Sequence, residues 1–399
     1  MKKFLALILA LVMALSLVAC GGNNNSEPEN PDTPDVTNTE YKVAMITDYG
    51  DITDQSFNQT TYEACKAFAE TNGVEFKYFK PAGDNTADRV SMIESAIDEG
   101  FNVIVMPGYA FGEAITETAP NFADVKFIAL DVSAGDLGAD FEVPANLYCA
   151  VYKEELCGYM AGYAAVKLGY KSLGFLGGMA VPAVQRYGYG FVQGVDAAAA
   201  EMALTDVTLN YVYGGQFFGD ADITGVMDTW YSKGTQVVFA CGGGIYTSAV
   251  DAAKKVEGAK VIGVDVDQAG VIANYAAGEG ADEATVEGFK ALTVTSAMKG
   301  LYPATYDTLT DVIVNGNWEK YSAKIDTLGL VSADDPSANY VQIPMDSTQW
   351  ADGAFTQDDY KALVAKMFSG ELTVSDDITK AASDFATVIT VDDQGAIKG

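Results

Sequence analysis

Residues 48–59 read Asp-Tyr-Gly-Asp-Ile-Thr-Asp-Gln-Ser-Phe-Asn-Gln and combine carboxylates, amides and an aromatic ring in a short span. They follow an apolar run and precede a helix-like segment at 60–71. Asp54 or Ser56 can cap that helix, whose first N–H groups would face a ligand, while Phe57 and Asn58 add a ring and an amide to the same rim. This pattern predicts the floor of a small-ligand site. A simple capped turn between a strand and a helix would use the same residue types.

Acidic residues also follow later apolar runs, and their chemistry allows two uses. Asp131 follows the run 126–130, and Asp265 and Asp267 follow the run 260–264. Two facing carboxylates could act as the acid and base of a glycoside or nucleoside hydrolase. They could instead accept hydrogen bonds from sugar hydroxyls or from the N–H groups of a base.

Histidine is absent from the chain, which removes the commonest general base and the usual zinc ligand. Ser-His-Asp and Cys-His catalysis are therefore unavailable. Four cysteines lie in apolar or helix-like segments without forming a CxxC pair: Cys65, Cys149, Cys157 and Cys241. We expect buried thiols there, and a Cys149–Cys157 disulfide stays open. The composition favours a binding protein, with neither a metal nor a catalytic role.

Two glycine-rich turns, at 177–178 and 242–244, each follow a predicted strand and precede a predicted helix. Neither matches the GxGxxG or GxxxxGK[ST] phosphate-binding pattern, so no cofactor is expected. We expect these glycines, Gly243 among them, to allow close backbone approach at the mouth of a cleft. Tyr246 could offer a ring to a flat ligand, and Lys299 could supply a counter-charge among the aspartates.

Short apolar runs alternate with helix-length segments, which is typical of an α/β fold with parallel sheets and helices on both faces. The first group of predicted strands is 41–47, 74–78, 103–106 and 126–130, with helices at 60–71, 85–99 and 112–119. The second group of strands is 172–176, 206–212, 237–240 and 260–264, with helices at 154–168, 185–202, 221–233 and 247–256. Ligand sites in such sheets lie beyond the carboxyl ends of the strands, so the candidate residues should meet there.

The two similar halves predict two Rossmann-like lobes with a cleft between them, and 399 residues exceed the usual size of a single core. We assign residues 41–148 and 270–320 to the first lobe, and 149–269 and 321–399 to the second. The chain would cross between the lobes near 148, 269 and 321. Further predictions are a strand at 291–295, a helix at 296–314 starting near Lys299, a loop insertion at 274–288, and helices near 358–369 and 375–386.

The N-terminal residues read as a secretory signal. Two lysines precede the apolar run 4–18, which is too short for a permanent membrane helix. A small residue followed directly by Cys20 resembles the bacterial lipobox, whose cysteine is diacylated; an ordinary signal peptide with a chance cysteine is the alternative. We therefore predict a lipoprotein signal peptide over 1–19 and a disordered, polar tether over 20–40. The protein would be lipid-anchored on the extracytoplasmic face of the cell membrane.

The charge of the chain excludes some partners. Lys and Arg number 24 and Asp and Glu number 55, which gives a formal net charge of −31. An acidic surface repels polyanions, so no nucleic acid is expected to bind. Contact with the membrane would then rest on the lipid anchor only.

Several of these motifs together resemble the basic membrane protein family, the purine-nucleoside-receptor-like lipoproteins of ABC transporters. The matching motifs are 54–59, Asp131, 177–186, 190–194, 242–244, 263–268 (Gly-Val-Asp-Val-Asp-Gln) and 295–299 (Thr-Ser-Ala-Met-Lys). They are in order and span about residues 41–330. The resemblance implies a hinged type I periplasmic-binding-protein fold without catalysis. It also implies capture of a nucleoside, expected to be a purine, for the permease subunits of an ABC importer.

The resemblance further implies roles for particular residues. Phe57 would stack on the base, with Asp54 and Asn58 at its edge. Asp131 and Asp265 would hold ribose hydroxyls. Lys299 would lie near the ribose, Gly243 at the cleft, and Tyr246 against the opposite ring face. We expect a monomer, and the open alternatives are a sugar, a flavin or another small ligand, or a hydrolase that uses Asp131 and Asp265.

Overall fold

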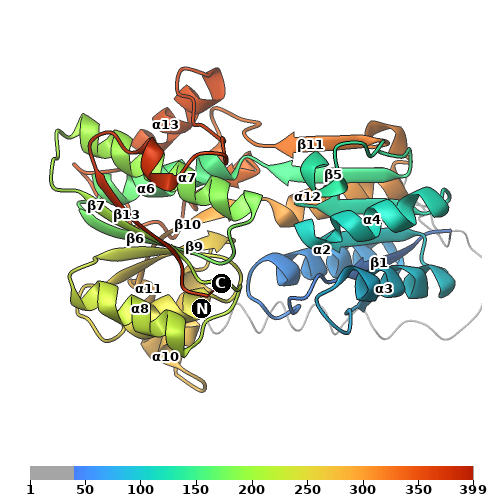
Figure 1. Cartoon of the computed structure of the whole chain (residues 1–399), viewed down its shortest axis with the longest axis horizontal. Coiled ribbons are helices and arrows are strands. Elements are labelled where there is room, and N and C mark those ends of the chain that lie inside the picture. The colour runs from blue at the N-terminus through green and yellow to red at the C-terminus, as the bar shows by residue number, and fades with distance from the viewer. Residues whose placement is uncertain (1–39, 399) are drawn as a thin grey trace, which may run out of the picture. The chain divides into compact units, whose positions relative to one another are not determined.

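The computed structural model describes residues 40–398, which form two β-sheets with helices on both faces (Figure 1). Sheet A has six parallel strands in the order β11-β5-β4-β3-β1-β2. Sheet B has seven strands in the order β12-β10-β9-β8-β6-β7-β13, in which β12 pairs antiparallel with β10. The predicted signal peptide, Cys20 and nearly all of the predicted tether fall on residues 1–39, outside the described residues.

The strands of sheet A are β1 (Lys42–Ile46), β2 (Glu75–Phe79), β3 (Val103–Pro107), β4 (Lys126–Leu130), β5 (Leu147–Tyr152) and β11 (Lys324–Leu328). The strands of sheet B are β6 (Ser172–Gly177), β7 (Thr208–Tyr213), β8 (Val237–Cys241), β9 (Lys260–Asp265), β10 (Thr293–Lys299), β12 (Val341–Gln342) and β13 (Thr390–Ala396). The α-helices are α2 (Phe57–Asn72), α3 (Thr86–Asp98), α4 (Gly112–Thr118), α5 (Ala134–Leu137), α6 (Glu154–Lys167), α7 (Pro182–Glu201), α8 (Ala221–Ser232), α9 (Tyr246–Ala253), α10 (Ala269–Ala277), α11 (Glu283–Lys290), α12 (Leu301–Leu309) and α13 (Gln357–Ser369).

The apolar strands are buried on both faces, which explains why the sequence shows continuous apolar runs. In β1, Val43 and Met45 belong to one core cluster with residues of α2, whereas Ala44 and Ile46 belong to another with residues of α3 and α4. This alternation follows from the two-residue repeat of a strand. Sheet B is covered in the same way, by α6 and α7 on one face and by α8, α9 and α10 on the other.

The predicted α/β class with parallel sheets is confirmed. The helices and strands predicted between 41 and 265 are all present, with ends that differ by no more than three residues. The periodicity was clear there because each strand is short, apolar and bounded by polar turns.

The predicted crossovers are wrong at two places. Strand β10 pairs in parallel with β9 and so stays in sheet B, although 270–320 was assigned to the first lobe. Strand β11 pairs in parallel with β5 in sheet A, although 321–399 was assigned to the second. The chain passes from sheet A to sheet B after β5, returns after β10, and passes again between β11 and β12. Strand pairing decided these positions, and local sequence does not encode it.

The predicted loop insertion at 274–288 is also wrong, because most of it lies in α10 and α11. Helix α10 buries Ile272 and Ala273, and Asp282 caps α11 by accepting a hydrogen bond of 2.8 Å from the backbone N–H of Thr285. Because this segment contains many small and acidic residues, its sequence shows no clear helical repeat of apolar residues, and the two short helices were not predicted.

Two helix predictions in the last third need correction. The helix expected from 296 begins at Leu301, because the chain is still in strand β10 up to Lys299. The helix near 358–369 is confirmed as α13, but 375–386 contains only a short 3₁₀ helix, at 382–385. Instead, the backbone of this segment bonds to side chains of α7: Ser375 N–H donates to Gln193 (2.8 Å) and Thr387 N–H to Asp196 (2.8 Å).

Helices α6 and α7 touch backbone to backbone because glycines face the partner helix. A Cβ atom on Gly158 would overlap the carbonyl oxygen of Tyr187, and one on Gly190 would overlap that of Glu155. Any side chain at these positions would force the helices apart. This close contact holds the start of α6 against the first turns of α7, where Glu154 of α6 pairs with Arg186 of α7.

All four cysteines of the described chain are buried with free thiols, so Cys149 and Cys157 do not pair. Among the helices between residues 40 and 398, none has the length and apolar character needed to cross a membrane.

Candidate ligand-binding site

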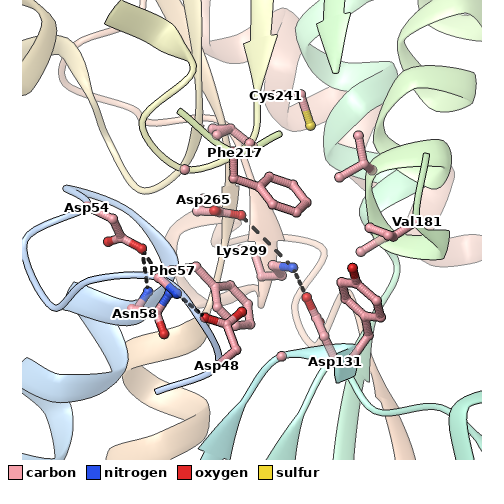
Figure 2. A pocket seen from close by; sticks show the side chains of 18 of the residues that line it. Asp48, Asp54, Phe57, Asn58, Asp131, Val181, Phe217, Cys241, Asp265 and Lys299 are labelled. Atoms are coloured by element: carbon pink, nitrogen blue, oxygen red, sulfur yellow. Dashed lines mark hydrogen bonds and ion pairs between the residues drawn. The ribbon is translucent and has the colours of Figure 1, made fainter. Parts of the chain in front are cut away.

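A pocket of about 400 Å³ opens where the carboxyl ends of strands from both sheets meet. Seven of the eight predicted ligand-binding residues line it: Asp54, Phe57, Asn58, Asp131, Gly243, Asp265 and Lys299. Figure 2 shows six of them gathered around a shared space, with Phe57 and Asn58 on α2 and Asp131 at the end of β4. The structure thus brings together residues that are up to 245 positions apart in the chain.

Tyr246 does not line this pocket. It is the first residue of α9, is buried in the core beneath sheet B, and packs edge-on against Tyr275 with ring centroids 5.8 Å apart.

Asp54 shapes the site by capping helix α2. Its Oδ1 accepts hydrogen bonds from the N–H groups of Ser56 (2.9 Å) and Gln59 (3.1 Å), and its Oδ2 accepts from the N–H of Asn58 (2.9 Å). Asn58 Nδ2 also donates to Oδ2 (3.2 Å). Both carboxylate oxygens are therefore used inside the protein, and Asp54 holds Asn58 in place.

Two residues of the pocket lining each carry a buried acceptor atom with no hydrogen-bond partner within residues 40–398: Asn58 Oδ1 and Asp131 Oδ1. An unpaired buried acceptor costs about 1–3 kcal/mol. Asn58 lies in the first turn of α2, and Asp131 directly follows β4. A ligand with donor groups at two separated points would satisfy both.

Lys299 is the centre of a buried charge cluster. Its Nζ lies 2.6 Å from Asp131 Oδ2, 3.3 Å from Glu154 Oε1 and 4.0 Å from Asp265 Oδ1. Arg186 Nε in turn contacts Glu154 Oε2 at 2.6 Å. Burial lowers the pKa of Lys299, but the three carboxylates outweigh it and hold this pKa above its usual range. Lys299 and Arg186, the two cationic side chains that line the pocket, are therefore both paired with carboxylates.

Asp131 and Asp265 occupy matching places in the two sheets, at the carboxyl ends of β4 and β9. Both have left-handed backbones, with φ of 60° and 63°. Such residues cost about 1–3 kcal/mol each and occur preferentially at functional sites. The Asp265 carboxylate accepts hydrogen bonds from Ser56 Oγ (2.6 Å), in the residue before α2, and from the hydroxyl of Tyr187 (3.1 Å), in α7. This geometry turns both carboxylates toward the pocket.

Burial controls the protonation of the pocket's acids. It raises the pKa of Asp131 to about 6, against the opposing effect of the Lys299 charge. It also raises the pKa of Asp48, although the backbone N–H groups of Gly50 and Tyr49 favour the charged form of that residue. Asp131 is therefore ionised at neutral pH, and its charge can be removed within a mildly acidic range.

Aromatic rings enter the pocket from both sheets. Phe57 comes from α2, and its ring centroid lies 4.9 Å from the Lys299 ammonium. Phe217, in the loop after β7, enters from the side of sheet B (Figure 2). It stacks on Tyr49 with ring centroids 6.2 Å apart and planes inclined by 28°. Phe217 was not among the predicted site residues, although the Gly-Gly-Gln-Phe-Phe sequence at 214–218 lies shortly after the strand predicted at 206–212 and is a usable signal.

The glycine turn at 242–244 provides room for Phe217. A Cβ atom on Gly242 would lie 2.8 Å from the Phe217 ring, and one on Gly243 would lie 2.9 Å from its carbonyl oxygen. Gly243 also has a positive φ of 48°. The predicted close backbone approach is therefore present, and the group approached within the protein is the Phe217 loop.

The arrangement suits binding of a polar, flat molecule. Within the described chain, no group of three or more acidic or cysteine residues is arranged to hold a metal ion. The oxygens of Asp265 accept hydrogen bonds from the protein, and Asp131 is paired with Lys299. The pocket lining provides two aromatic rings, Phe57 and Phe217, and two residues with unpaired acceptor atoms, Asn58 and Asp131.

Comparison with known proteins gives the family. The profile described as "ABC transporter substrate-binding protein PnrA-like" matches residues 41–342. The ABC transporter nucleoside-binding protein BmpA of Lactococcus lactis subsp. cremoris is 27% identical over 280 residues, which cover 67% of this chain and 75% of that protein. Basic membrane protein B of Borreliella burgdorferi is 27% identical over 331 residues, which cover 81% of this chain and 86% of that protein.

A solved structure supports the fold. A solute-binding protein of an ABC transporter system from Aeropyrum pernix K1 aligns with a TM-score of 0.64 at 20% identity, over 86% of this chain and 90% of that one. The predicted type I periplasmic-binding-protein fold is confirmed. The family consists of substrate-binding proteins and not of enzymes, so a hydrolase is set aside. With a match over most of its length, the chain belongs to the PnrA-like family of ABC transporter substrate-binding proteins.

Proposed function

We propose that this solute-binding protein captures a purine nucleoside in the pocket between its two sheets. The observation that carries the proposal is the combination of ring faces from both sheets with the two unpaired acceptors, Asn58 Oδ1 and Asp131 Oδ1. A nucleoside has a flat base with N–H donors at one end and ribose hydroxyl donors at the other. The volume of about 400 Å³ is within the usual range of small-ligand pockets.

The base would lie between Phe57 and Phe217. Offset stacking on an aromatic ring adds about 0.5–1.5 kcal/mol beyond the burial of area. Asn58 Oδ1 would accept a hydrogen bond from an N–H group at the edge of the base. Asp54 would act indirectly, because its oxygens are taken up by the cap of α2 and by Asn58.

The ribose would lie toward Asp131 and Lys299. Asp131 Oδ1 is the unpaired acceptor there, and a hydroxyl bound to an ionised carboxylate makes a charge-assisted hydrogen bond. Asp265 would add a second carboxylate close to Lys299. The related BmpA protein, named as nucleoside-binding, supports this ligand class.

The charges of the pocket argue for a nucleoside and against a nucleotide. Lys299 and Arg186 are both paired with buried carboxylates, so neither cation is available to a phosphate group. Besides Asp131, five acids line the same pocket: Asp48, Asp51, Asp54, Asp136 and Asp265. A phosphate would meet net repulsion there.

We further propose two lobes, one around each sheet, that close on the ligand by hinge motion at the three crossovers. The lobes would act as a monomer that delivers the ligand to ABC permease subunits. Cys20 would carry the lipid anchor on the extracytoplasmic face of the membrane. Membrane association is also suggested by the basic membrane proteins among the relatives.

The proposal is tested by identifying what co-purifies with residues 40–399. Mass spectrometry of the released ligand, together with thermal shifts for a panel of nucleosides, nucleotides, sugars and flavins, distinguishes the ligand classes. A ligand at 100 times its dissociation constant stabilises the protein by about 2.7 kcal/mol, which is visible as a melting shift. We expect purine nucleosides to bind and their monophosphates not to bind. A sugar or a flavin as the bound molecule would contradict the proposed ligand and leave the transport role intact.

A further inference from the structure

The loop at 214–220 carries Phe217 and Phe218 into the pocket wall. On one side, this loop rests on the glycine turn after β8. The N–H of Gly244 donates a hydrogen bond of 2.9 Å to the carbonyl of Phe217, and Phe218 forms an isolated β-bridge with Gly244. The Phe217 ring therefore packs directly against glycine backbone, at Gly178 and Gly242.

The C-terminal segment holds the other side of the loop. Strand β13 pairs in parallel with β7, and the N–H of Ile397 donates to the carbonyl of Tyr213 (2.8 Å), just before the loop. At Gly215, where φ is +84°, a Cβ atom would lie 2.7 Å from the carbonyl oxygen of Lys398. The backbone at Lys398 thus runs directly against the start of the loop.

The Lys398 side chain links two points of the loop. Its ammonium donates to the carboxylate of Asp220 and lies 3.3 Å from Gln216 Oε1. Gln216 Nε2 donates in turn to Asp220 Oδ2 (2.8 Å) and to the carbonyl of Phe218 (3.0 Å). Phe217 lies between these bonded residues. The other Asp220 oxygen caps α8, which fixes the end of the loop.

These contacts come from outside the part of the chain that the family profile matches. The match ends at residue 342, whereas β13 and Lys398 lie beyond it. An exposed ion pair on its own contributes little. Lys398 differs because its side chain is only one-third exposed, at 33%, and it joins both ends of one short loop.

We propose that Lys398 is a positioning residue for ligand binding: through Gln216 and Asp220 it holds the loop at 214–220, and hence the Phe217 ring, over the pocket. The effect on ligand binding rests on the proposed function, in which the base stacks on Phe217. The position of the ring can be measured without any ligand.

The first test places 4-fluorophenylalanine at position 217 and records ¹⁹F NMR spectra without added ligand. We expect a single resonance in the parent protein. Lys398→Met should broaden this resonance or split it, and Lys398→Arg should restore it. Lys380→Met is the matched control, because Lys380 pairs with Asp377 (3.9 Å) on the same segment, away from this loop. An unchanged ¹⁹F spectrum in Lys398→Met would overturn the proposal.

The second test measures the dissociation rate of guanosine by stopped flow. Lys398→Met should release guanosine about three- to tenfold faster, the range given by a partly lost aromatic contact. In a Phe217→Ala/Phe218→Ala background the same substitution should have no effect, and an undiminished effect there would contradict a role through this loop. If the ¹⁹F spectrum changes but no nucleoside binds, the ligand proposal fails and the positioning role stands. If guanosine binds and the ¹⁹F spectrum is unchanged, the positioning role fails.

Discussion

The ammonium of Lys299 lies 2.6 Å from the carboxylate of Asp131 and thereby connects the end of β10 in sheet B to the end of β4 in sheet A. Both side chains are buried, with 2% and 10% of their surface exposed. The chain returns to sheet A directly after Lys299, so this ion pair lies at a crossover. The same contact therefore belongs to the pocket and to the connection between the sheets.

Replacing Lys299 by methionine should destabilise the protein strongly. The substitution leaves Asp131 buried without its cation and leaves Glu154 paired with Arg186 alone, and breaking a buried pair in this way costs about 3–5 kcal/mol. Urea unfolding monitored by circular dichroism measures the loss. Lys361→Met is the control, since this exposed lysine pairs at 4.0 Å with Asp358 and should change stability by less than about 0.5 kcal/mol. Equal stability of the two variants would contradict a net-stabilising role of Lys299.

Asp131→Asn should weaken nucleoside binding while keeping the shape of the side chain. The variant loses the charge of the acceptor offered to the ligand hydroxyl, and we expect a loss of at least about tenfold, or 1.4 kcal/mol. Isothermal titration calorimetry with guanosine measures the change. Asp140→Asn, at an exposed position nearby in the chain, should bind as the parent protein does. Normal binding by Asp131→Asn would mean that the ribose lies elsewhere.

Removal of either aromatic ring, Phe57 or Phe217, should weaken nucleoside binding by a factor similar to that expected for Asp131→Asn. Phe57→Ala and Phe217→Ala each remove one ring from the pocket, and we expect at least about a tenfold loss of affinity for Phe57→Ala. Tyr246→Phe should bind normally, because Tyr246 packs in the core against Tyr275. Phe368→Ala, at an exposed position on α13, controls for nonspecific effects. A loss of affinity in Tyr246→Phe with none in Phe217→Ala would reverse this assignment.

Ligand affinity and stability should respond to pH in opposite directions through Asp131. Burial raises its pKa to about 6 from an ordinary value of 3.8, so the folded protein takes up this proton at higher pH than the unfolded chain. As the pH falls through about 6, the carboxylate is neutralised and nucleoside affinity should decrease. The contribution of this group to stability should increase over the same change and level off below about pH 4. Titrations between pH 5 and 8 check this, with Asp131→Asn expected to give a flatter profile.

Because α6 and α7 are in close contact, adding a single methyl group between them should destabilise the protein. Gly190→Ala places a methyl group against the carbonyl of Glu155, and such overpacking costs about 1–3 kcal/mol. Gly225→Ala is a matched control, because Gly225 lies on α8 with open space around its Cβ direction. There the substitution should stabilise the protein by about 0.5–1 kcal/mol. Thermal unfolding of both variants compares the two effects, and a stabilising Gly190→Ala would show that the helices can move apart freely.

Local sequence predicted most of the helices and strands up to residue 265, but it missed strand β5 of sheet A. Strands such as β1 and β8 are short apolar runs between polar turns, and helices such as α3 show a clear apolar face. Local sequence did not predict the sheet to which β10, β11 and β13 belong, because membership of a sheet depends on a partner strand that can be far away in the chain. Lys299 illustrates the difference: its motif was recognised, but it was placed at the start of a helix instead of at the end of a strand.

The sequence alone determined the class of fold and placed seven of the eight predicted site residues at the pocket, because the carboxyl ends of parallel strands meet at one edge whatever their order. Asp131, Asp265 and Phe57 follow from that rule. Only the tertiary structure decided which groups are available to a ligand. It showed that the oxygens of Asp54 are used in capping α2, that Tyr246 is in the core, and that Phe217 is in the pocket. Hydrogen-bond partners and burial depend on contacts between distant segments, and these form only when the chain is folded.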